Sequence, residues 1–477
     1  MPRRDALTTV ELVEADDADD AVAQEPGTRT RSRKRWWLLA VPVAAAVLAA
    51  GVQLGSDALE RAADARIAAL PGAIDPVGDS VQALWRSEPG TGALAHGLVA
   101  HDALHAVLVG PDGAVSYDAV DLRSGDQLWS TTLRGPDPAQ TDPLYPNAST
   151  CTPDAEPGAE PERVVCLVTD GPTPGAIEPR PGTESRIVVL DLADGHVLAD
   201  RPGPPVASLA VLPGLAATAV VEDRHVVVVS ADPLTGRELW RYRHPEPSEQ
   251  EPWIGAGGGV VVVFGTPGGP IVLSASGDRV PTEPGTTGWG TTEEGWFVTE
   301  RSDPGGRIQR VVRPGEPPVE VTGRLLDRTV DDGSVPGLEV SVGGITSGWD
   351  AGTGEQLWEA DISVPPYQDE DVLIIDGMVF LTSDDAVVAL DARTGETRWT
   401  AARQQGSYVG QLLTDGAHVI LVEAPQDGFG TAYLTVLDRR DGAFVRRLAL
   451  PDTVTYPVSA GRHLVGAGPL GTVVGLG

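Results

Sequence analysis

The feature that most constrains this fold is a short phrase that recurs along the chain: Asp, then Gly four residues later, then Trp four residues after that. The clearest copy reads Asp350-Ala-Gly-Thr-Gly-Glu-Gln-Leu-Trp358. Internal repeats are examined before other signals because they set the architecture. Two degenerate copies, at Asp191/Gly195 and Asp438/Gly442, keep the turn and lack the Trp. The full phrase occurs at Asp121/Gly125/Trp129, Asp232/Gly236/Trp240, Asp350/Gly354/Trp358 and Asp391/Gly395/Trp399.

Each copy predicts two strands joined by a tight turn. An apolar β-type run, such as Ala386-Val-Val-Ala-Leu390, precedes the Asp. The Asp carboxylate can accept backbone N–H groups within a turn, and Gly supplies the positive φ that a short hairpin loop requires. The Trp of the second strand buries a large apolar area and keeps an N–H to donate. We therefore interpret the phrase as strand, turn, strand and apolar plug.

The spacing of the copies predicts a β-propeller. Trp358 and Trp399 are 41 residues apart, and a repeat of about 40–45 residues with four short strands is the size of one propeller blade. We therefore expect an all-β fold of about eight four-stranded blades. Seven to nine blades are left open, because the middle of the chain lacks the full phrase. Last-strand candidates lie at Trp85, Trp129, Ala199 and Trp240, near Val280 and near Val319, and at Trp358, Trp399 and Arg446.

The two ends of the repeat region complement each other. Ala83-Leu-Trp85 resembles the second half of a repeat, and Gly471–Gly477 resembles the first half. A propeller closes when a strand from one end completes the blade from the other, which removes two exposed sheet edges. Residues 77–86 are therefore expected to supply the closing strand of the last blade.

The segment before the repeats predicts a membrane anchor. Residues 1–35 are acidic and then basic, and we expect a disordered cytoplasmic tail. Residues 36–54 form an apolar run near the ~20 residues that span a bilayer as a helix, and the basic run before it places the N-terminus in the cytoplasm. A cleaved signal peptide is the alternative, although the leader is long for one. Residues 55–76 then read as a helical stalk or linker, and residues 77–477 as an extracytoplasmic propeller.

The net charge limits the class of binding partner, and the cysteines predict a disulfide. The net charge of −33 disfavours nucleic acid, because phosphates are bound by Lys and Arg; we interpret the acidity as a contribution to solubility. The chain has two cysteines. Outside the cytosol, Cys151 and Cys166 are expected to form a disulfide. It would pin an insertion at 134–162 that contains the weak glycosylation sequon Asn147-Ala-Ser149.

The phrases “DPLTGRELW” at 232–240, “DAGTGEQLW” at 350–358 and “ALDARTGETRW” at 389–399 resemble quinoprotein-type propeller repeats with tryptophan-docking motifs. The resemblance covers about 75–477 and implies that Trp129, Trp240, Trp358 and Trp399 pack between neighbouring blades. The family includes pyrroloquinoline-quinone-dependent alcohol dehydrogenases and a non-enzymatic propeller lipoprotein of the outer-membrane β-barrel assembly machine. The dehydrogenases place a disulfide of adjacent cysteines over the quinone, and Cys151 and Cys166 are not adjacent.

Other residue clusters carry weaker signals. His96, His101 and His105 could meet only through strand bending, and we interpret them as ordinary strand or surface histidines. The acidic pairs Asp331-Asp332, Asp369-Glu370 and Asp384-Asp385 suit solvated turns better than Ca²⁺ sites. Gly255–Gly259 reads as a turn. Trp289, Trp296 and Trp349 could line a sugar or peptide pocket, although packing between blades explains them more simply. We therefore assign no catalytic, cofactor-binding or metal-binding residue.

Three functions follow as hypotheses. The first is a membrane-anchored, extracytoplasmic scaffold that binds an unknown protein or cell-envelope partner and is not an enzyme. The second is a quinone-dependent dehydrogenase, whose expected site is missing. The third is a transmembrane sensor with a propeller ectodomain. The repeat itself concerns stability, so activity is expected in residues that differ between blades.

Overall fold

The computed structural model describes residues 58–137, 149–156, 158–170, 184–205, 208–248, 250–282, 286–292, 296–303, 306–312, 317–364, 371–383, 385–403, 407–425 and 431–477. The chain divides into two compact units, Met1–Glu60 and Arg61–Gly477. Only residues 58–60 of the first are described, and they are helical. No helix within the described ranges is long and apolar enough to cross a membrane. The predicted tail 1–35 and membrane segment 36–54 lie outside those ranges.

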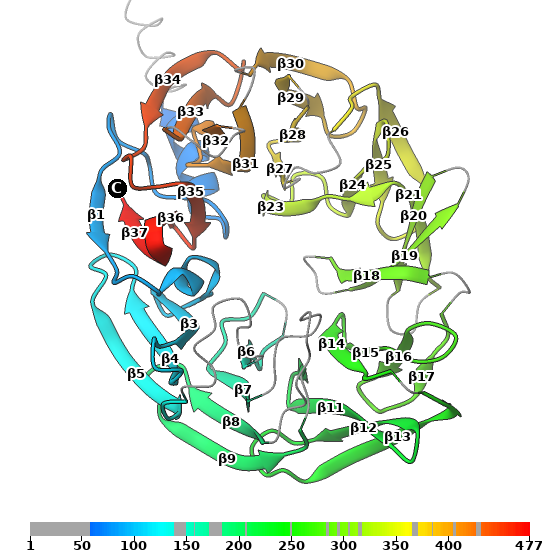
Figure 1. The fold of residues 1–477 in the computed structure, drawn as a ribbon. Helices are drawn as coiled ribbons and strands as arrows, with labels where there is room; N and C mark the ends of the chain where they lie inside the picture. The colour runs from blue at the N-terminus through cyan, green and yellow to red at the C-terminus, as the bar shows by residue number, and fades with distance from the viewer. Residues whose placement is uncertain are drawn as a thin grey trace, which may run out of the picture. The chain divides into compact units, whose positions relative to one another are not determined.

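The second unit is an all-β propeller. Its described residues form nine sheets that follow one another around a common centre (Figure 1). That number is one more than the expected eight and is the upper end of the expected range. Each of the nine last-strand candidates lies in the outer strand of a different sheet. The count was ambiguous because the two blades between Trp253 and Thr322 lack the full phrase, although each still builds four strands.

We number the blades in chain order. Blades 1 to 4 are regular antiparallel meanders. Blade 1 contains β2 (Leu98–Ala100), β3 (Ala103–Val109), β4 (Val115–Asp121) and β5 (Gln127–Arg134). Blade 2 contains β6 (Thr150–Pro153), β7 (Arg163–Thr169), β8 (Ser185–Asp191) and β9 (Val197–Gly203). Blade 3 contains β10 (Ala210–Leu212), β11 (Leu215–Glu222), β12 (His225–Ala231) and β13 (Glu238–Pro247). Blade 4 contains β14 (Trp253–Gly257), β15 (Val260–Phe264), β16 (Ile271–Ser274) and β17 (Arg279–Val280).

The remaining blades include one irregular pair, blades 6 and 7, which share a segment described further below. Blade 5 contains β18 (Thr286–Thr291), β19 (Phe297–Asp303), β20 (Gly306–Val312) and β21 (Val319–Thr322). Blade 6 contains β22 (Arg324–Leu325), β24 (Leu338–Val342), β25 (Thr346–Asp350) and β26 (Gln356–Ala360). Blade 7 contains β23 (Asp327–Asp331), β27 (Asp371–Ile375), β28 (Met378–Thr382), β29 (Ala386–Asp391) and β30 (Thr397–Ala402). Blade 8 contains β31 (Ser407–Thr414), β32 (His418–Pro425), β33 (Tyr433–Asp438) and β34 (Phe444–Ala449).

Blade 9 closes the ring with strands from both ends of the unit. It contains β35 (Tyr456–Ala460), β36 (His463–Gly468), β37 (Thr472–Leu476) and, as its outer strand, β1 (Ala83–Arg86). β1 pairs antiparallel with β37, with Trp85 opposite Gly475. The predicted closing strand is therefore confirmed. Two short 3₁₀ helices, η1 (Gly92–His96) and η3 (Pro469–Gly471), flank this closure.

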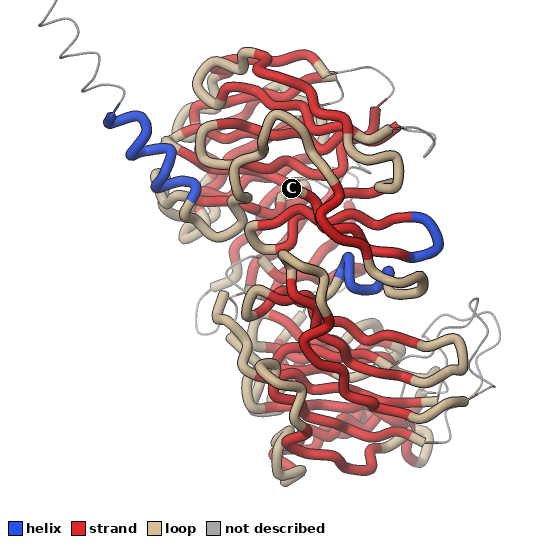
Figure 2. The backbone as a smooth tube through the Cα atoms, turned by 90° about the vertical axis from the view of Figure 1, so that its left-hand side faces the viewer, coloured by secondary structure: helices blue, strands red, loops and turns tan. Residues whose placement is uncertain are grey.

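The apolar core lies between adjacent blades rather than in one central cluster. Val340 of blade 6 and Ile374 and Val388 of blade 7, for example, belong to one buried cluster. Burial between neighbours is expected of a repeat fold, where each sheet covers the face of the next. Residues 61–68 are helical, and Figure 2 shows this helix beside the stacked strands.

Candidate functional site

The repeated turn is built around its Asp carboxylate. In blade 1, Asp121 Oδ1 accepts the N–H groups of Arg123 at 3.0 Å and Ser124 at 2.7 Å. The bond from the Ser124 N–H holds the pKa of Asp121 below its ordinary value, because it favours the ionised form. The Gly125 N–H donates to the Asp121 carbonyl at 2.9 Å. The same pattern recurs at Asp232, Asp350 and Asp391, and in the degenerate copies at Asp191 and Asp438.

The Trp of each phrase packs on the turn of the next blade. Trp358 Nε1 donates to the Ala392 carbonyl at 2.9 Å, and its ring covers Gly395 so closely that an added Cβ would lie 2.7 Å from it. Trp399 makes the equivalent bond to the Arg439 carbonyl and covers Gly442. Trp129 covers Gly195, and Trp240 donates to the Ala275 carbonyl and covers Gly277. Trp85 of the closing strand likewise donates to the Leu122 carbonyl and covers Gly125.

These contacts explain the order of the residues in the phrase. The turn Gly adopts a positive φ, which disfavours residues with a Cβ. It also leaves room for the indole of the preceding blade. At Gly236 and Gly354, the covering side chains are Arg201 and Val319, so the position tolerates other residues where the preceding blade lacks Trp.

Cys151 and Cys166 form a disulfide, which confirms the predicted pair. The two residues lie opposite each other in the β6–β7 ladder of blade 2, and Cys166 is fully buried. The bridge therefore ties two neighbouring strands together inside a sheet. Residues 138–148 of the predicted insertion, including Asn147, lie outside the described residues.

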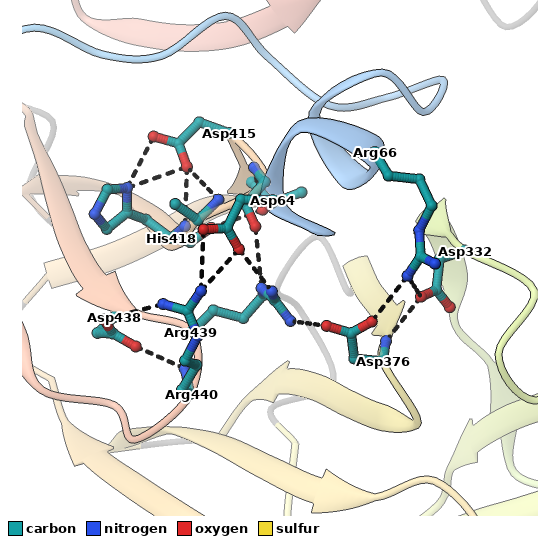
Figure 3. Close-up of polar contacts among 12 residues, drawn as sticks. Asp64, Arg66, Asp332, Asp376, Asp415, His418, Asp438, Arg439 and Arg440 are labelled. Atoms are coloured by element: carbon teal, nitrogen blue, oxygen red, sulfur yellow. Dashed lines mark hydrogen bonds and ion pairs between the residues drawn. The ribbon is translucent and has the colours of Figure 1, made fainter. Parts of the chain in front are cut away.

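The most elaborate polar site joins residues 61–76, which we call the N-terminal arm, to the propeller (Figure 3). Arg439 is its centre and has 3% of its side chain exposed. It donates from Nη1 to Asp376 Oδ2 at 2.6 Å, from Nη2 to Asp64 Oδ1 at 3.1 Å and from Nε to the Gly416 carbonyl at 3.0 Å. Each of these three groups accepts a hydrogen bond from the buried guanidinium, which compensates the cost of burying its charge.

The network extends to both sides of Arg439. Arg440 Nη2 reaches both carboxylate oxygens of Asp64 at 3.0 Å. Arg66 donates to Asp376 Oδ1 at 3.2 Å and lies 3.9 Å from Asp332 Oδ2. Burial alone would raise the pKa of Asp332, but hydrogen bonds from Ser334 and from the Asp376 N–H, with Arg66 nearby, bring it below its ordinary value. Carboxylates and guanidiniums therefore alternate across the junction.

Backbone and apolar contacts complete the attachment of the arm. The Ile74 N–H donates to the Thr414 carbonyl at 2.9 Å, and the Asp75 N–H to the Arg462 carbonyl at 2.8 Å. Ile67 is fully buried in a cluster with Leu373 and Leu412. The arm therefore contacts blades 7, 8 and 9. The arm's partners lie in turns between the first and second strands of a blade (Gly416 and Arg462) or between the third and fourth strands (Arg439). These turns share one face of the ring, because successive strands of a blade run in opposite directions.

The weaker candidates each have a local structural role. His96 ends η1, His101 lies in a turn beside Glu160, and His105 is buried against Tyr117 and Trp129. The described residues contain no group of three His, Cys, Asp or Glu side chains that could hold a metal ion. Gly255–Gly257 lie in β14, and only Gly258 and Gly259 form a turn.

The acidic residues and tryptophans that the structure describes at these positions have local partners. Asp331 pairs with Arg328 at 3.1 Å. Trp349 is buried, donates to Ser341 Oγ at 2.8 Å and belongs to the core, and Trp296 packs partly buried against the same cluster. Asp369-Glu370, Asp384 and the Trp289 side chain lie outside what the structure describes.

Sequence reasoning missed Arg439 and its partners. A signal was present, because the residue after the turn Asp is Leu122, Leu192, Pro233, Ala351 or Ala392 in the other copies and Arg in this one. A charged residue at a position where the repeat otherwise places an apolar one indicates a contact specific to that blade.

Comparisons with known proteins agree with the repeat. Residues 282–466 match the family described as outer membrane protein assembly factor BamB. A serine/threonine-protein kinase, AfsK, from Streptomyces griseus is 35% identical over 114 residues, which are 22% of this chain and 13% of the kinase. The chain thus matches only a small part of that relative's length.

Two solved structures are similar at low sequence identity. BamB from Moraxella catarrhalis is 16% identical, with 83% of this chain and 97% of that chain covered and a TM-score of 0.40. The quinohemoprotein alcohol dehydrogenase from Comamonas testosteroni is 12% identical, with 85% and 78% covered and a TM-score of 0.37. The sequence match over 282–466 confirms the resemblance to the quinoprotein-type repeat family.

Proposed function

We propose that this propeller of quinoprotein-type repeats is a membrane-anchored scaffold outside the cytoplasm, which binds a protein or another cell-envelope component through one face of its ring. The observation that carries the proposal is the attachment of the N-terminal arm. The chain enters the propeller through residues that are held by ion pairs, backbone hydrogen bonds and a buried Ile67. A free tether would need none of these contacts.

The position of the arm supports a proposal about which face of the ring binds the partner. The arm occupies the face that carries the Asp-x-x-x-Gly turns. The loops between strands 2 and 3 lie on the opposite face, where the β15–β16 loop contains Gly268 with open space around its Cβ position. Loops on a rigid ring are the usual place for recognition residues, so we assign partner binding to this opposite face.

A dehydrogenase function receives less support from the residues present. The Cys151–Cys166 bridge joins two paired strands, and Cys166 is fully buried in the blade. It therefore does not fit the disulfide of adjacent cysteines that covers the quinone in those enzymes. Purified protein mixed with pyrroloquinoline quinone and Ca²⁺ should show no turnover in a dye-reduction assay, and turnover would overturn the scaffold proposal.

Two experiments on the full chain test the scaffold. After alkaline extraction of membranes, the full chain should stay in the pellet and a variant lacking residues 36–54 should not; a full chain in the supernatant would contradict the anchor. A photo-crosslinking residue at Gly268 should capture a discrete partner in cells. The same residue at Leu234, in a turn on the arm's face, is the matched control. Equal capture at both positions, or none at Gly268, would contradict the assignment of the face.

A further inference from the structure

The one irregular step in the ring lies between blades 6 and 7. The first strand of blade 6, β22, is only two residues long. The chain then leaves blade 6, and β23 pairs in parallel with β27 of blade 7. All other ladders among the described strands are antiparallel. The innermost strand of blade 6 is therefore too short to cover the whole edge of that blade where it meets blade 5.

A cavity of about 220 Å³ lies at this point. A single water needs about 10–15 Å³ on the same measure, so the cavity has room for a small molecule of amino-acid size. Blade 5 contributes β18, β19 and β20, and the other wall comes from β22, β23 and β24. The charged and amide side chains that line the cavity are Glu300, Gln309, Arg324, Asp327, Arg328 and Glu339.

Charges of both signs face this cavity, and two of them are buried. Arg328 and Glu339 have 7% and 6% of their side chains exposed and lie 3.7 Å apart, and Arg328 also pairs with Asp331 at 3.1 Å. On the opposite wall, Glu300 is held by Arg307 at 3.2 Å and accepts a hydrogen bond from Gln309 at 3.4 Å. Keeping such charges inside a cleft costs desolvation energy. A zwitterionic ligand offers each sign its complement and adds no net charge to the site.

The same strand that forms the cavity wall also supports the N-terminal arm. Asp327 and Arg328 line the cavity. One residue further on, Gly72 of the arm sits directly on the Thr329 carbonyl, so that a Cβ at residue 72 would collide with it. Val330 then shares a buried cluster with Ile67. The first two residues of this strand thus line the cavity, and the next two contact the arm.

We propose that the cavity between blades 5 and 6 binds a small zwitterion of the free amino-acid class, and that β23 transmits its occupancy to the arm. Arg324 and Arg328 face the ligand carboxylate, and Glu300 and Glu339 face its ammonium group. This inference goes beyond the scaffold function and does not depend on the partner or the membrane anchor.

Calorimetric titration of the purified full-length protein in detergent tests the ligand class. The probes are the twenty L-amino acids, each compared with the amine that lacks its carboxylate and the acid that lacks its amino group. We expect at least one amino acid to bind one-to-one, and both counterparts to bind at least tenfold more weakly. No binding up to millimolar concentration, or equal binding of the amine, would overturn the proposal.

Variants locate the site. Arg324→Gln and Glu300→Gln should each weaken binding at least tenfold while the melting temperature stays near that of the wild type. Arg241→Gln, an exposed arginine on β13, is the matched control and should bind normally. Two variants are used so that one misfolded protein does not decide the result. Unchanged affinity in both folded variants would place any bound amino acid elsewhere and overturn the site.

Hydrogen exchange of the arm tests transmission. Saturation with the amino acid found by titration should slow amide exchange in residues 64–76 of the wild type and leave exchange in blade 2, on the other side of the ring, unchanged. Binding without any change in the arm would overturn the role of β23.

Discussion

Trp399 and Arg439 are joined by a hydrogen bond of 3.2 Å from the indole Nε1 to the backbone carbonyl. Through this bond the docking Trp of blade 7 holds the turn of blade 8, while the side chain of the same Arg439 holds the N-terminal arm. The general packing of the repeat and the specific attachment of the arm thus meet at one residue. The predictions below separate these two roles.

Gly442→Ala should destabilise the protein by more than the cost of its backbone conformation. The φ of Gly442 is +71°, and an added Cβ would lie 2.5 Å from the Trp399 ring. Gly214→Ala is the matched control, because its φ is also +71° and nothing lies near its Cβ position. We expect a loss of about 1–2 kcal/mol for the control and ~1–3 kcal/mol more for Gly442→Ala, measured by denaturant unfolding. Equal losses would show that Trp399 does not occupy the turn.

Trp358→Ala should lower the free energy of unfolding by about 3–5 kcal/mol, because it removes a buried aromatic side chain and leaves the Ala392 carbonyl without its indole donor. Leu357, the preceding residue, has 45% of its surface exposed, and Leu357→Ala should change stability by no more than ~0.5 kcal/mol. Comparable effects of the two substitutions, in urea titrations of both variants, would refute the docking role of Trp358.

His105 should make the protein less stable as the pH falls from neutral to mildly acidic. Burial lowers its pKa from 6.5 and outweighs the hydrogen bond to the Ala100 carbonyl, and His101 lowers the pKa further. Below pH 6.5 the unfolded chain binds a proton that the folded protein does not, so the free energy of unfolding decreases until the pH reaches the lowered native pKa. His105→Gln should flatten this part of the stability–pH curve. His196→Gln removes an exposed histidine in another blade and is the control for the substitution itself.

The double substitution Cys151→Ser, Cys166→Ser should destabilise blade 2 by about 2–4 kcal/mol, the usual range for a bridge that closes a short loop. Reduction of the wild type should have the same effect. Protection of blade 2 amides should fall more than protection of blade 7 amides in hydrogen-exchange measurements. A uniform or absent change would mean that the bridge does not stabilise the sheet in which it lies.

The regular parts of this fold could be predicted because the residues of the repeat make their contacts at fixed sequence offsets. One turn is formed by Asp391 and Gly395, and Trp399 packs on the turn of the next blade. The turns, the blades and the closing strand therefore follow from the spacing of the phrase. The number of blades was less certain because blades 4 and 5 replace the phrase with other residues. In blade 4, Ser274 and Gly277 form the turn on which Trp240 packs.

The arm and the cavity could not be predicted in the same way. Arg439 and Asp64 are 375 residues apart, and neither belongs to a pattern that links them. The pairing of β23 with β27 of the next blade is a tertiary contact, and no local sequence preference encodes it. Both sites lie where the chain departs from its repeat, which is where activity was expected.

Loss of the Arg439 guanidinium should loosen the arm without unfolding the ring. In Arg439→Gln, Asp64 and Asp376 lose their shared partner. The loss of stability should stay below the ~3–5 kcal/mol of a fully buried pair, because both carboxylates keep some contact with water. Arg440→Gln, at a half-exposed position, is the control and should have a smaller effect on the melting temperature.

Hydrogen exchange at the amides of Ile74 and Asp75 in the full-length protein tests most directly whether the arm is a fixed part of the propeller. Both amides donate to propeller carbonyls, so they should exchange as slowly as strand amides of blade 8 and faster in Arg439→Gln. Exchange at the rate of an unstructured peptide in the wild type would contradict the attachment of the arm, and with it the observation on which the scaffold proposal rests.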